Sequence, residues 1–318
     1  MDFIAMGRIN VDFYPCEMNV PFGMVKTFRK SIGGSPANIA VGTARLGIKT
    51  GFIGKVSGDA LGSYILDFFD KEGIDTSQIK VDGTGAMNCI AVTEVKSPED
   101  CSAIIYRDNV ADVRIEPSDV SEDYIKEAKI LLVSGTALSR SPSREAVFTA
   151  LSYANKHGVQ TYLDLDYRAM AWDSPAEASR QYRRAAGMCN VIIGTKEEIG
   201  VVKLSGDYKF DVDMVIIKYG KDGSAAFLRD GTMINGAAFP AKAIKTYGAG
   251  DAYASALIYG VLEKMEFSQC LEYAAASASI VVSREACGES SPTLEEIKGF
   301  VAAVKTNVGF AHDPPGSK

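Results

Sequence analysis

The fold is decided by a glycine-rich run, Thr246-Tyr247-Gly248-Ala249-Gly250-Asp251, which is followed at once by Ala252-Tyr253-Ala254-Ser255-Ala256-Leu257. Two glycines and an alanine give this loop almost no side-chain bulk, and the small and apolar residues behind it predict a helix. The first turn of a helix offers unpaired backbone N–H groups and a partial positive charge. The run therefore predicts a phosphate-binding loop at a helix N-terminus, with backbone donors from Gly248, Ala249 and Gly250.

Asp251 lies at the mouth of this predicted anion site, where a carboxylate would repel a bare phosphate. We interpret it as a base that accepts the proton of a substrate hydroxyl while that hydroxyl attacks the phosphate. The alternative is an ordinary glycine-rich turn in which Asp251 caps the helix. This stretch alone does not decide between the two interpretations.

A second glycine motif, Gly33-Gly34-Ser35-Pro36-Ala37-Asn38, stands near the N-terminus. The two glycines let the backbone come close to a ligand, and Pro36 suits the start of a helix. Asn38 offers both a donor and an acceptor, which suits a sugar hydroxyl. The two motifs in this order resemble the ribokinase-like, or PfkB, family of carbohydrate kinases.

This resemblance implies a fold, a reaction and cofactors. The family has a doubly wound, mainly parallel α/β sheet with a small β lid, and it transfers phosphate from ATP with Mg²⁺. Some of its members use a monovalent cation such as K⁺ near the glycine-rich loop. Further runs resemble a branch of the family that phosphorylates the terminal hydroxyl of a sugar acid in myo-inositol catabolism; they span 97–102, 106–112, 133–146, 164–168 and 277–283. A 2-keto-3-deoxygluconate kinase or a fructokinase is the alternative, and a non-catalytic sugar- or nucleotide-binding protein on the same fold is disfavoured because Asp251 is retained.

The resemblance also implies substrate-binding residues. Asp12 would bind sugar hydroxyls beside Gly33, Gly34 and Asn38; alternatively, Asp12 only forms a turn. An arginine can bind a carboxylate through two hydrogen bonds, so Arg107 or Arg168 would hold the acid group of the substrate.

Each arginine has an alternative partner. Arg107 could pair with Asp108 or Asp112 at the surface. Arg168 could contact nucleotide phosphates.

The nucleotide side is less distinct. Lys218-Tyr219-Gly220-Lys221-Asp222-Gly223 resembles the family's turn near the nucleotide, although Asp222-Gly223 is also a common hairpin pair. Gly194-Thr195-Lys196-Glu197 stands where the family has Asn-x-x-Glu, so Glu197 would act on Mg²⁺ through water. Ala275 offers no side chain to the base, so adenine would be held by shape and apolar packing. The nucleotide-binding residues expected here are Lys196, Lys218, Gly220, Gly223, Gly248 and Gly250.

Composition agrees with a cytoplasmic enzyme. The 318 residues are 47% hydrophobic and 23% charged, and a net charge of −6 gives no general attraction to nucleic acid. No apolar run is long enough to span a membrane, and the N-terminus does not resemble a signal peptide. Six scattered cysteines, without a Cys-x-x-Cys pair, predict free thiols, and the two histidines lack partners for a zinc site or a catalytic triad.

Short apolar runs alternate with amphipathic helices along the chain, which predicts a doubly wound parallel sheet. The chain has neither a Gly-x-Gly-x-x-Gly run after its first strand nor a P-loop, so dehydrogenases and P-loop enzymes are excluded. Residues 13–31 and 88–107 alternate like antiparallel strands and would form the lid, through which a homodimer is expected because lid strands expose edges. We expect one kinase domain over 1–310 and a disordered tail over 311–318. The predicted strands are Phe3–Met6, Thr50–Ile53, Ile130–Val133, Thr161–Leu163, Val191–Ile193 and Val215–Ile217; the predicted helices include Ser35–Leu46, Leu61–Glu72, Ser143–His157 and Ala176–Met188.

Overall fold

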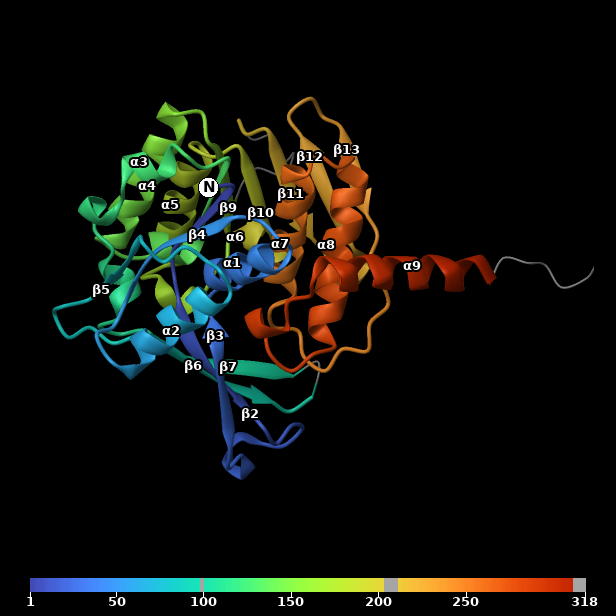
Figure 1. The fold of residues 1–318 in the computed structure, drawn as a ribbon, viewed down its shortest axis with the longest axis horizontal. Coiled ribbons are helices and arrows are strands. Elements are labelled where there is room, and N and C mark those ends of the chain that lie inside the picture. The colour runs from blue at the N-terminus through green and yellow to red at the C-terminus, as the bar shows by residue number, and fades with distance from the viewer. Residues whose placement is uncertain (98–99, 203–210, 311–318) are drawn as a thin grey trace, which may run out of the picture.

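A large, mainly parallel sheet runs through the middle of the protein (Figure 1). The computed structural model describes residues 1–97, 100–202 and 211–310. Within them the sheet has nine strands in the order β13-β12-β11-β10-β9-β8-β1-β4-β5; β12 pairs antiparallel with both β11 and β13, and the other neighbouring strands pair parallel. The strands are β1 (Phe3–Met6), β4 (Thr50–Val56), β5 (Ile79–Val81), β8 (Ile130–Ser134), β9 (Gln160–Asp164), β10 (Val191–Thr195), β11 (Met214–Lys218), β12 (Ser224–Leu228) and β13 (Met233–Gly236).

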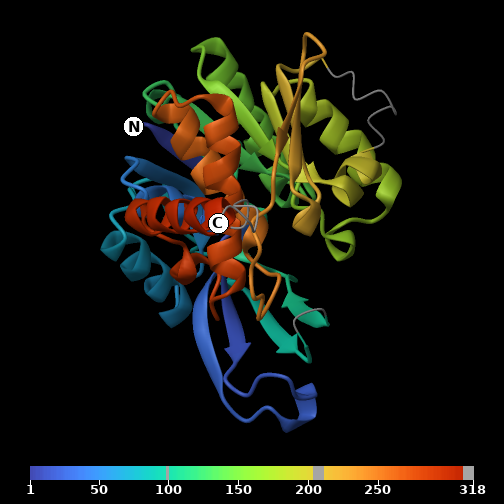
Figure 2. The same ribbon diagram turned by 90° about the vertical axis from the view of Figure 1, so that its right-hand side faces the viewer.

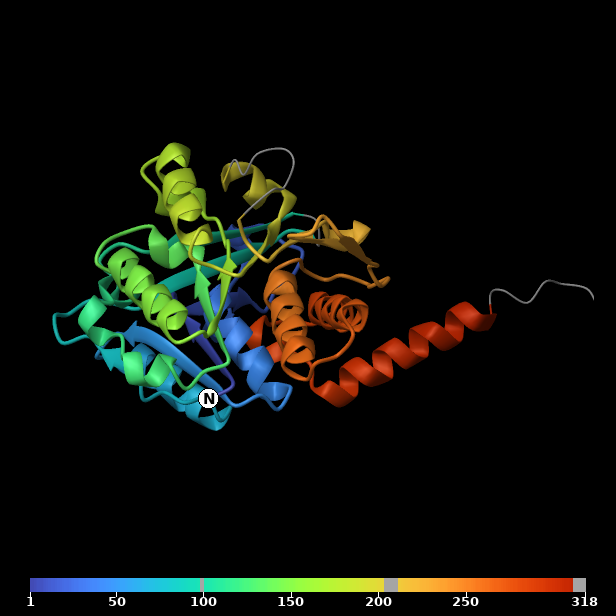
Figure 3. The same ribbon diagram turned by 90° about the horizontal axis from the view of Figure 1, so that it is seen from above.

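The strands are apolar throughout because both faces of the sheet are covered. Side chains alternate along a strand, so Phe3 and Ala5 of β1 enter one hydrophobic core while Ile4 and Met6 enter the other. Helices cover both faces, as Figures 2 and 3 show. The first core is closed by α1 (Ser35–Arg45), α2 (Ala60–Lys71), α7 (Ala249–Leu262), α8 (Phe267–Val282) and α9 (Leu294–Phe310). The second is closed by α3 (Glu122–Ile125), α4 (Ser143–Lys156), α5 (Pro175–Ala186) and α6 (Lys196–Val202).

A four-stranded sheet projects from one end of this body (Figure 2). Its strands, in the order β3-β2-β6-β7, are β2 (Asn10–Pro15), β3 (Phe28–Gly33), β6 (Cys89–Val95) and β7 (Cys101–Tyr106). The expected antiparallel pairing is confirmed for β2 with β3 and for β6 with β7. The central pair, β2 with β6, is parallel, because the two hairpins both enter the lid in the same direction.

The predicted strands and helices are all confirmed, with ends that differ by at most three residues. Seven short 3₁₀ helices complete the described chain: η1 (Phe22–Met24), η2 (Ala111–Arg114), η3 (Pro117–Asp119), η4 (Gly135–Leu138), η5 (Ala169–Ala171), η6 (Gly220–Asp222) and η7 (Gly288–Ser290). All six cysteines are thiols rather than members of a disulfide, as expected. In the described residues, no helix is both long enough and apolar enough to cross a membrane. The single domain stays a prediction, and residues 98, 99 and the tail 311–318 lie outside the described residues.

Candidate active site

The glycine-rich loop turns directly into α7, as expected. Gly248 is the N-cap and has a φ of +81°, a left-handed conformation that favours glycine. A Cβ at Gly248 would also lie only 2.9 Å from Cys287 Sγ. Both the backbone angle and the space beneath the loop therefore require glycine here. Ala249 and Gly250 form the first turn, so their N–H groups lie at the positive end of the helix.

Asp251 follows in the same turn and is held by the other glycine motif. Asn38 Nδ2 donates to Asp251 Oδ2 at 2.8 Å. Burial raises the pKa of Asp251 above its ordinary value, while the hydrogen bond from Asn38 opposes that rise. A carboxylate with a raised pKa and a fixed orientation is suited to accept a proton.

The glycines before Asn38 are needed for close packing. A Cβ at Gly33 would overlap the carboxylate of Asp12, and one at Gly34 would overlap the carbonyl oxygen of Arg8. Asp12 is buried on β2, where it accepts hydrogen bonds from Asn10 Nδ2 and, at 3.1 Å, from the hydroxyl of Tyr14. Burial raises the pKa of Asp12 to about 6. The two glycines thus bring β3 and α1 against the buried Asp12.

A cavity of about 430 Å³ lies on the other side of the α7 N-terminus. Lys218, Gly220, Gly223 and Gly250, expected on the nucleotide side, are among its lining residues. Lys196 is not; it is exposed at the start of α6. Ala275 does line the cavity, together with further apolar and small residues: Ala238, Phe239, Ala241, Ala243, Ala278 and Val282. The cavity therefore combines an apolar wall with backbone and lysine donors at one end.

Lys218 is the cation at that end. A Cβ at Gly250 would lie 2.9 Å from Lys218 Nζ, so this ammonium lies directly beside the glycine-rich turn. Its Nζ is also 3.7 Å from Asp164 Oδ1. Although burial opposes it, Asp164 and the other nearby carboxylates raise the pKa of Lys218, which keeps the ammonium charged.

At the Asn-x-x-Glu position, the glutamate that the structure holds in place is Glu198 and not Glu197, the residue expected from the sequence. Glu197 is exposed, whereas Glu198 accepts hydrogen bonds from the backbone N–H groups of Tyr167 at 3.0 Å and Thr195 at 2.8 Å. Thr195 Oγ1 in turn accepts from the N–H of Glu198 at 3.2 Å, so the pair forms a capping box at the start of α6. Thr-x-x-Glu before an apolar run is the signal of this box, and it was available in the sequence.

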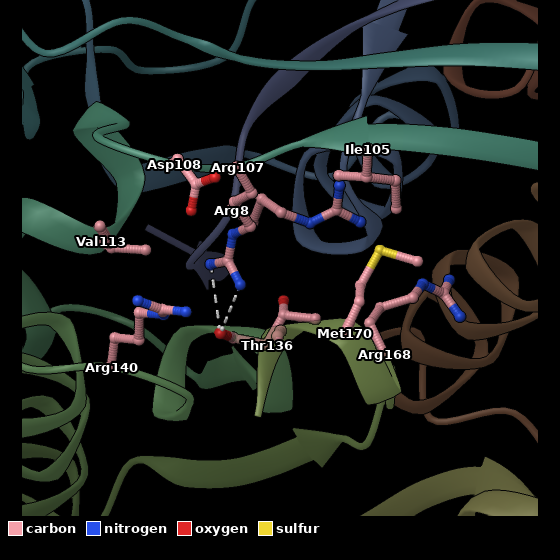
Figure 4. A pocket seen from close by; sticks show the side chains of 10 residues that line it. Arg8, Ile105, Arg107, Asp108, Val113, Thr136, Arg140, Arg168 and Met170 are labelled. Atoms are coloured by element: carbon pink, nitrogen blue, oxygen red, sulfur yellow. Dashed lines mark hydrogen bonds between the residues drawn. The ribbon is translucent and has the colours of Figure 1, made fainter. Parts of the chain in front are cut away.

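A second cavity, of about 130 Å³, is lined by four arginines: Arg8, Arg107, Arg140 and Arg168 (Figure 4). We call it the arginine pocket. Asp108 is the one carboxylate among its lining residues. Neither Arg8 nor Arg140 was expected from the sequence to have a role, although Arg140 lies in the run 133–146 that resembles the sugar-acid branch of the family.

Arg107 lines this pocket, but its five N–H donors are all used within the protein. Nε and Nη2 donate to the buried Asp112, both Nη atoms donate to the carbonyl oxygen of Thr136 at 3.2 Å, and Nη1 donates to Ser139 Oγ at 3.1 Å. Figure 4 marks the bonds to Thr136. The alternative pairing of Arg107 with Asp112 is therefore confirmed, and its guanidinium keeps no free pair of donors for a carboxylate.

The other arginines are less fully engaged. Arg168 is 45% exposed and its Nη2 lies 2.8 Å from Asp166 Oδ1. Arg8 is buried; it donates to Asn10 Oδ1 at 2.7 Å, and its Nε has no hydrogen-bond partner. Although burial alone would raise it, the charges of Arg168 and Arg8 hold the pKa of Asp166 below its ordinary value. Arg140 has no ion pair with any residue that the structure describes. The pocket therefore presents cationic donors that are suited to an anion.

Comparison with known proteins identifies the family of this chain. Residues 2–294 match the model of the pfkB family carbohydrate kinases. The chain belongs to this family. It is 47% identical to a 5-dehydro-2-deoxygluconokinase of Geobacillus thermodenitrificans, over 96% of this chain and 94% of that protein. It is 49% identical to one of Bacillus thuringiensis, over 95% of both chains.

A solved structure also matches nearly the whole chain. An uncharacterized sugar kinase from Pyrococcus horikoshii in complex with ATP superposes with a TM-score of 0.82 and 25% identity, over 94% of this chain and 99% of that one. The ribokinase-like fold, with its parallel sheet and lid, is thereby confirmed. The protein is a carbohydrate kinase of this family.

Proposed function

We propose that this chain transfers the γ-phosphoryl group of ATP to the C6 hydroxyl of 5-dehydro-2-deoxy-D-gluconate, in myo-inositol catabolism. The observation that carries the proposal is the arginine pocket, which lies on the lid side of a carbohydrate kinase site. Asp166, and to a smaller extent Glu198 and Asp251, raise the pKa of Arg168 in that pocket although burial opposes it, which keeps its guanidinium charged. A sugar acid has its carboxylate at one end and its C6 hydroxyl at the other, so one molecule can meet both Arg168 and Asp251.

Asp251 is the base in this proposal. Its Oδ atoms accept the proton of the C6 hydroxyl as that oxygen bonds to the γ-phosphorus and the bond to the ADP oxygen breaks. Asn38 fixes the carboxylate through its 2.8 Å hydrogen bond. The N–H groups of Gly248, Ala249 and Gly250 and the ammonium of Lys218 stabilise the charge on the phosphate oxygens.

ATP fits the larger cavity. Adenine would pack against its apolar wall, which includes Phe239 and Ala275, and the phosphates would reach Gly250 and Lys218. Mg²⁺ binds through one or two carboxylates, waters and the phosphates, so a cluster of three protein ligands is not needed, and the described residues hold none. Asp164 and Glu198 would hold the hydrated ion, which neutralises phosphate charge. Glu198 thus takes the role expected of Glu197.

The carboxylate of the substrate would bind Arg168, supported by the unpartnered Nε of Arg8 and by Arg140. Asp12, Gly33 and Gly34 would contact the sugar hydroxyls. Arg107 would shape the pocket through Asp112 and add positive charge without a direct bond to the acid. A 2-keto-3-deoxygluconate kinase fits the same pocket, whereas a fructokinase would leave these arginines without an anion.

The test is an ATP-coupled assay against a panel of sugar acids and neutral sugars. The expected result is the highest kcat/KM with 5-dehydro-2-deoxygluconate and little turnover of fructose. If the enzyme prefers 2-keto-3-deoxygluconate, the arginine pocket still binds a carboxylate, but the proposed substrate is wrong. Equal kcat/KM for fructose and the acids would contradict the proposal.

We also propose that two copies of the chain associate through their lids in the cytoplasm. Ile105 lines the arginine pocket, so its neighbours Ile104 and Tyr106 point to the outer face of β7, where they are 52% and 60% exposed. A second lid would cover these apolar side chains. The measurement is mass by light scattering at micromolar concentration; Ile104→Lys is expected to convert a dimer into a monomer, and a monomeric wild type would contradict this.

A further inference from the structure

Lys245 is buried completely beneath the glycine-rich loop, with 0% of its surface exposed. It lies three residues before Gly248, the N-cap of α7. A lysine is seldom buried unless its charge is compensated, because removal of an ammonium from water is costly. Nothing in the proposed phosphoryl transfer uses this side chain directly.

The contacts of its ammonium are all uncharged in the part of the chain that the structure describes. Lys245 Nζ donates to the carbonyl oxygen of Tyr247 at 2.7 Å and to that of Val281 at 3.4 Å, and it lies 3.9 Å from Cys287 Sγ. Its three N–H groups thus find three acceptors. Burial lowers the pKa of Lys245, while nearby Cys287 and Asp251 oppose that shift.

The two carbonyl groups come from places that attract a cation. Val281 is in the last turn of α8, whose C-terminal carbonyls carry a partial negative charge. Tyr247 directly precedes Gly248, so its carbonyl belongs to the loop that positions the α7 N-terminus. Converging backbone carbonyls are also the ligands that K⁺ prefers. Here the Lys245 ammonium already occupies the point where they converge.

We propose that Lys245 is a built-in monovalent cation behind the phosphate-binding loop, so that this kinase needs no added K⁺. The inference rests on the proposed function only in taking the loop as the ATP phosphate site. The ammonium fixes the carbonyl of Tyr247 and thereby the conformation of Gly248, and its charge lies behind the phosphates. The expected K⁺ does not fit, because it would need the position that Nζ holds and like charges repel.

The first experiment uses the wild-type protein. Its kcat, its KM for ATP and the Kd of a non-hydrolysable ATP analogue, measured by calorimetry, are compared in KCl and in tetramethylammonium chloride at equal ionic strength. We expect all three values to agree within about twofold, since the salts then differ only in a cation that has no site. A clear loss of turnover or of nucleotide affinity without K⁺ would overturn the proposal. The Kd of the ATP analogue is measured without sugar, so this measurement still tests the proposal if the sugar substrate has been assigned wrongly.

The second experiment removes the ammonium. Lys245→Ala and Lys245→Met lose the hydrogen bonds of a charged donor to the carbonyls of Tyr247 and Val281 and to Cys287 Sγ, so we expect analogue affinity and kcat/KM to fall by roughly 10- to 100-fold. Lys245→Ala leaves room among the carbonyls, and NH₄⁺ or K⁺ should restore part of the loss, whereas the side chain of Lys245→Met fills that room. Lys242→Ala, on the same segment but exposed, is the matched control.

The outcomes of the second experiment separate a specific role from a merely structural one. Cation rescue of Lys245→Ala alone supports the proposal. Wild-type affinity in Lys245→Ala, or equal losses in both variants without any response to NH₄⁺ or K⁺, would overturn it. If neither variant folds, the salt comparison on the wild type still decides the question.

Discussion

Asn38 donates a hydrogen bond to Asp251 across 2.8 Å, and this contact joins two motifs that are 213 positions apart in the chain. The close approach of α1 and α7 makes the contact possible. A Cβ at Gly42 of α1 would overlap the hydroxyl oxygen of Ser255 on α7, so the two helices cross closely. The spacing of the motifs in sequence says nothing about this geometry; the small residues on the facing helices bring it about.

Asp251→Asn tests the base. We expect kcat to fall by about 10²-fold or more, the size of effect of a positioned base. Affinity for ATP should change little, because the backbone donors of the loop remain. The measurement is steady-state kinetics together with calorimetry of nucleotide binding. Near-normal turnover in this variant would show that another group takes the proton.

Asn38→Ala tests how the base is tuned. The hydrogen bond from Asn38 lowers the pKa of Asp251, so its removal should raise that pKa further. A base acts when deprotonated, and the acid limb of the kcat/KM profile should therefore move to higher pH. The pH profiles of wild type and variant check this. A fall in activity with an unmoved acid limb would mean that Asn38 serves only the substrate.

Gly250→Val tests the phosphate loop. Gly250 lies in the first helical turn and has no positive φ; the left-handed residue of the loop is Gly248. The effect expected at Gly250 is steric, since its Cβ would meet Lys218 Nζ at 2.9 Å. Calorimetry should show loss of ATP binding in a folded protein. Gly248→Ala is the contrast: strain at φ +81° should cost about 1–3 kcal/mol of stability.

The parts of the site that the sequence could predict are those in which backbone chemistry demands a residue type. Gly34 and Gly248 adopt positive φ, which glycine tolerates best, so the two glycine-rich motifs indicated both positions. Arg8 and Lys245 could not be found in this way. A buried cation is identified by its partners, and those partners, Asp166 and the carbonyl of Val281, come from distant parts of the chain. Arg107 was equally ambiguous, because the sequence offers both Asp108 and Asp112 as partners, and only the fold shows that Asp112 forms the ion pair.

Asp12→Asn tests how much the buried, ionised carboxylate of Asp12 lowers the stability of the folded protein. The pKa of Asp12 is raised to about 6 in the folded protein, against about 3.9 in an unfolded chain. A raised folded pKa means that stability is fully present below about pH 4 and is lost as the pH rises through about 6, by up to about 3 kcal/mol. The asparagine cannot ionise, so the variant should gain stability over wild type at pH 8 and not at pH 4. Urea unfolding at both pH values checks this, and an equal change at both would contradict the assignment.

Arg168→Ala and Arg107→Ala together test where the carboxylate binds. Loss of a charge-assisted contact to the substrate carboxylate costs about 2–4 kcal/mol, so Arg168→Ala should lower kcat/KM for the sugar acid by roughly 30- to 1000-fold. Turnover of fructose, however slow, should change far less. Arg168→Lys should recover only part, since an ammonium cannot reproduce the planar pair of donors.

Arg107→Ala is expected to behave differently, because it leaves Asp112, whose side chain is 1% exposed, without its partner. Removal of one member of a buried ion pair costs about 3–5 kcal/mol, so this variant should lose stability. Its kcat/KM should fall by similar factors for the sugar acid and for fructose. The measurements are kcat/KM for 5-dehydro-2-deoxygluconate and fructose, and urea unfolding, in all three variants. If the Arg107→Ala protein is stable and loses only its activity on the sugar acid, Arg107 and not Arg168 binds the substrate carboxylate. In that case the ion pair with Asp112 must open when substrate binds.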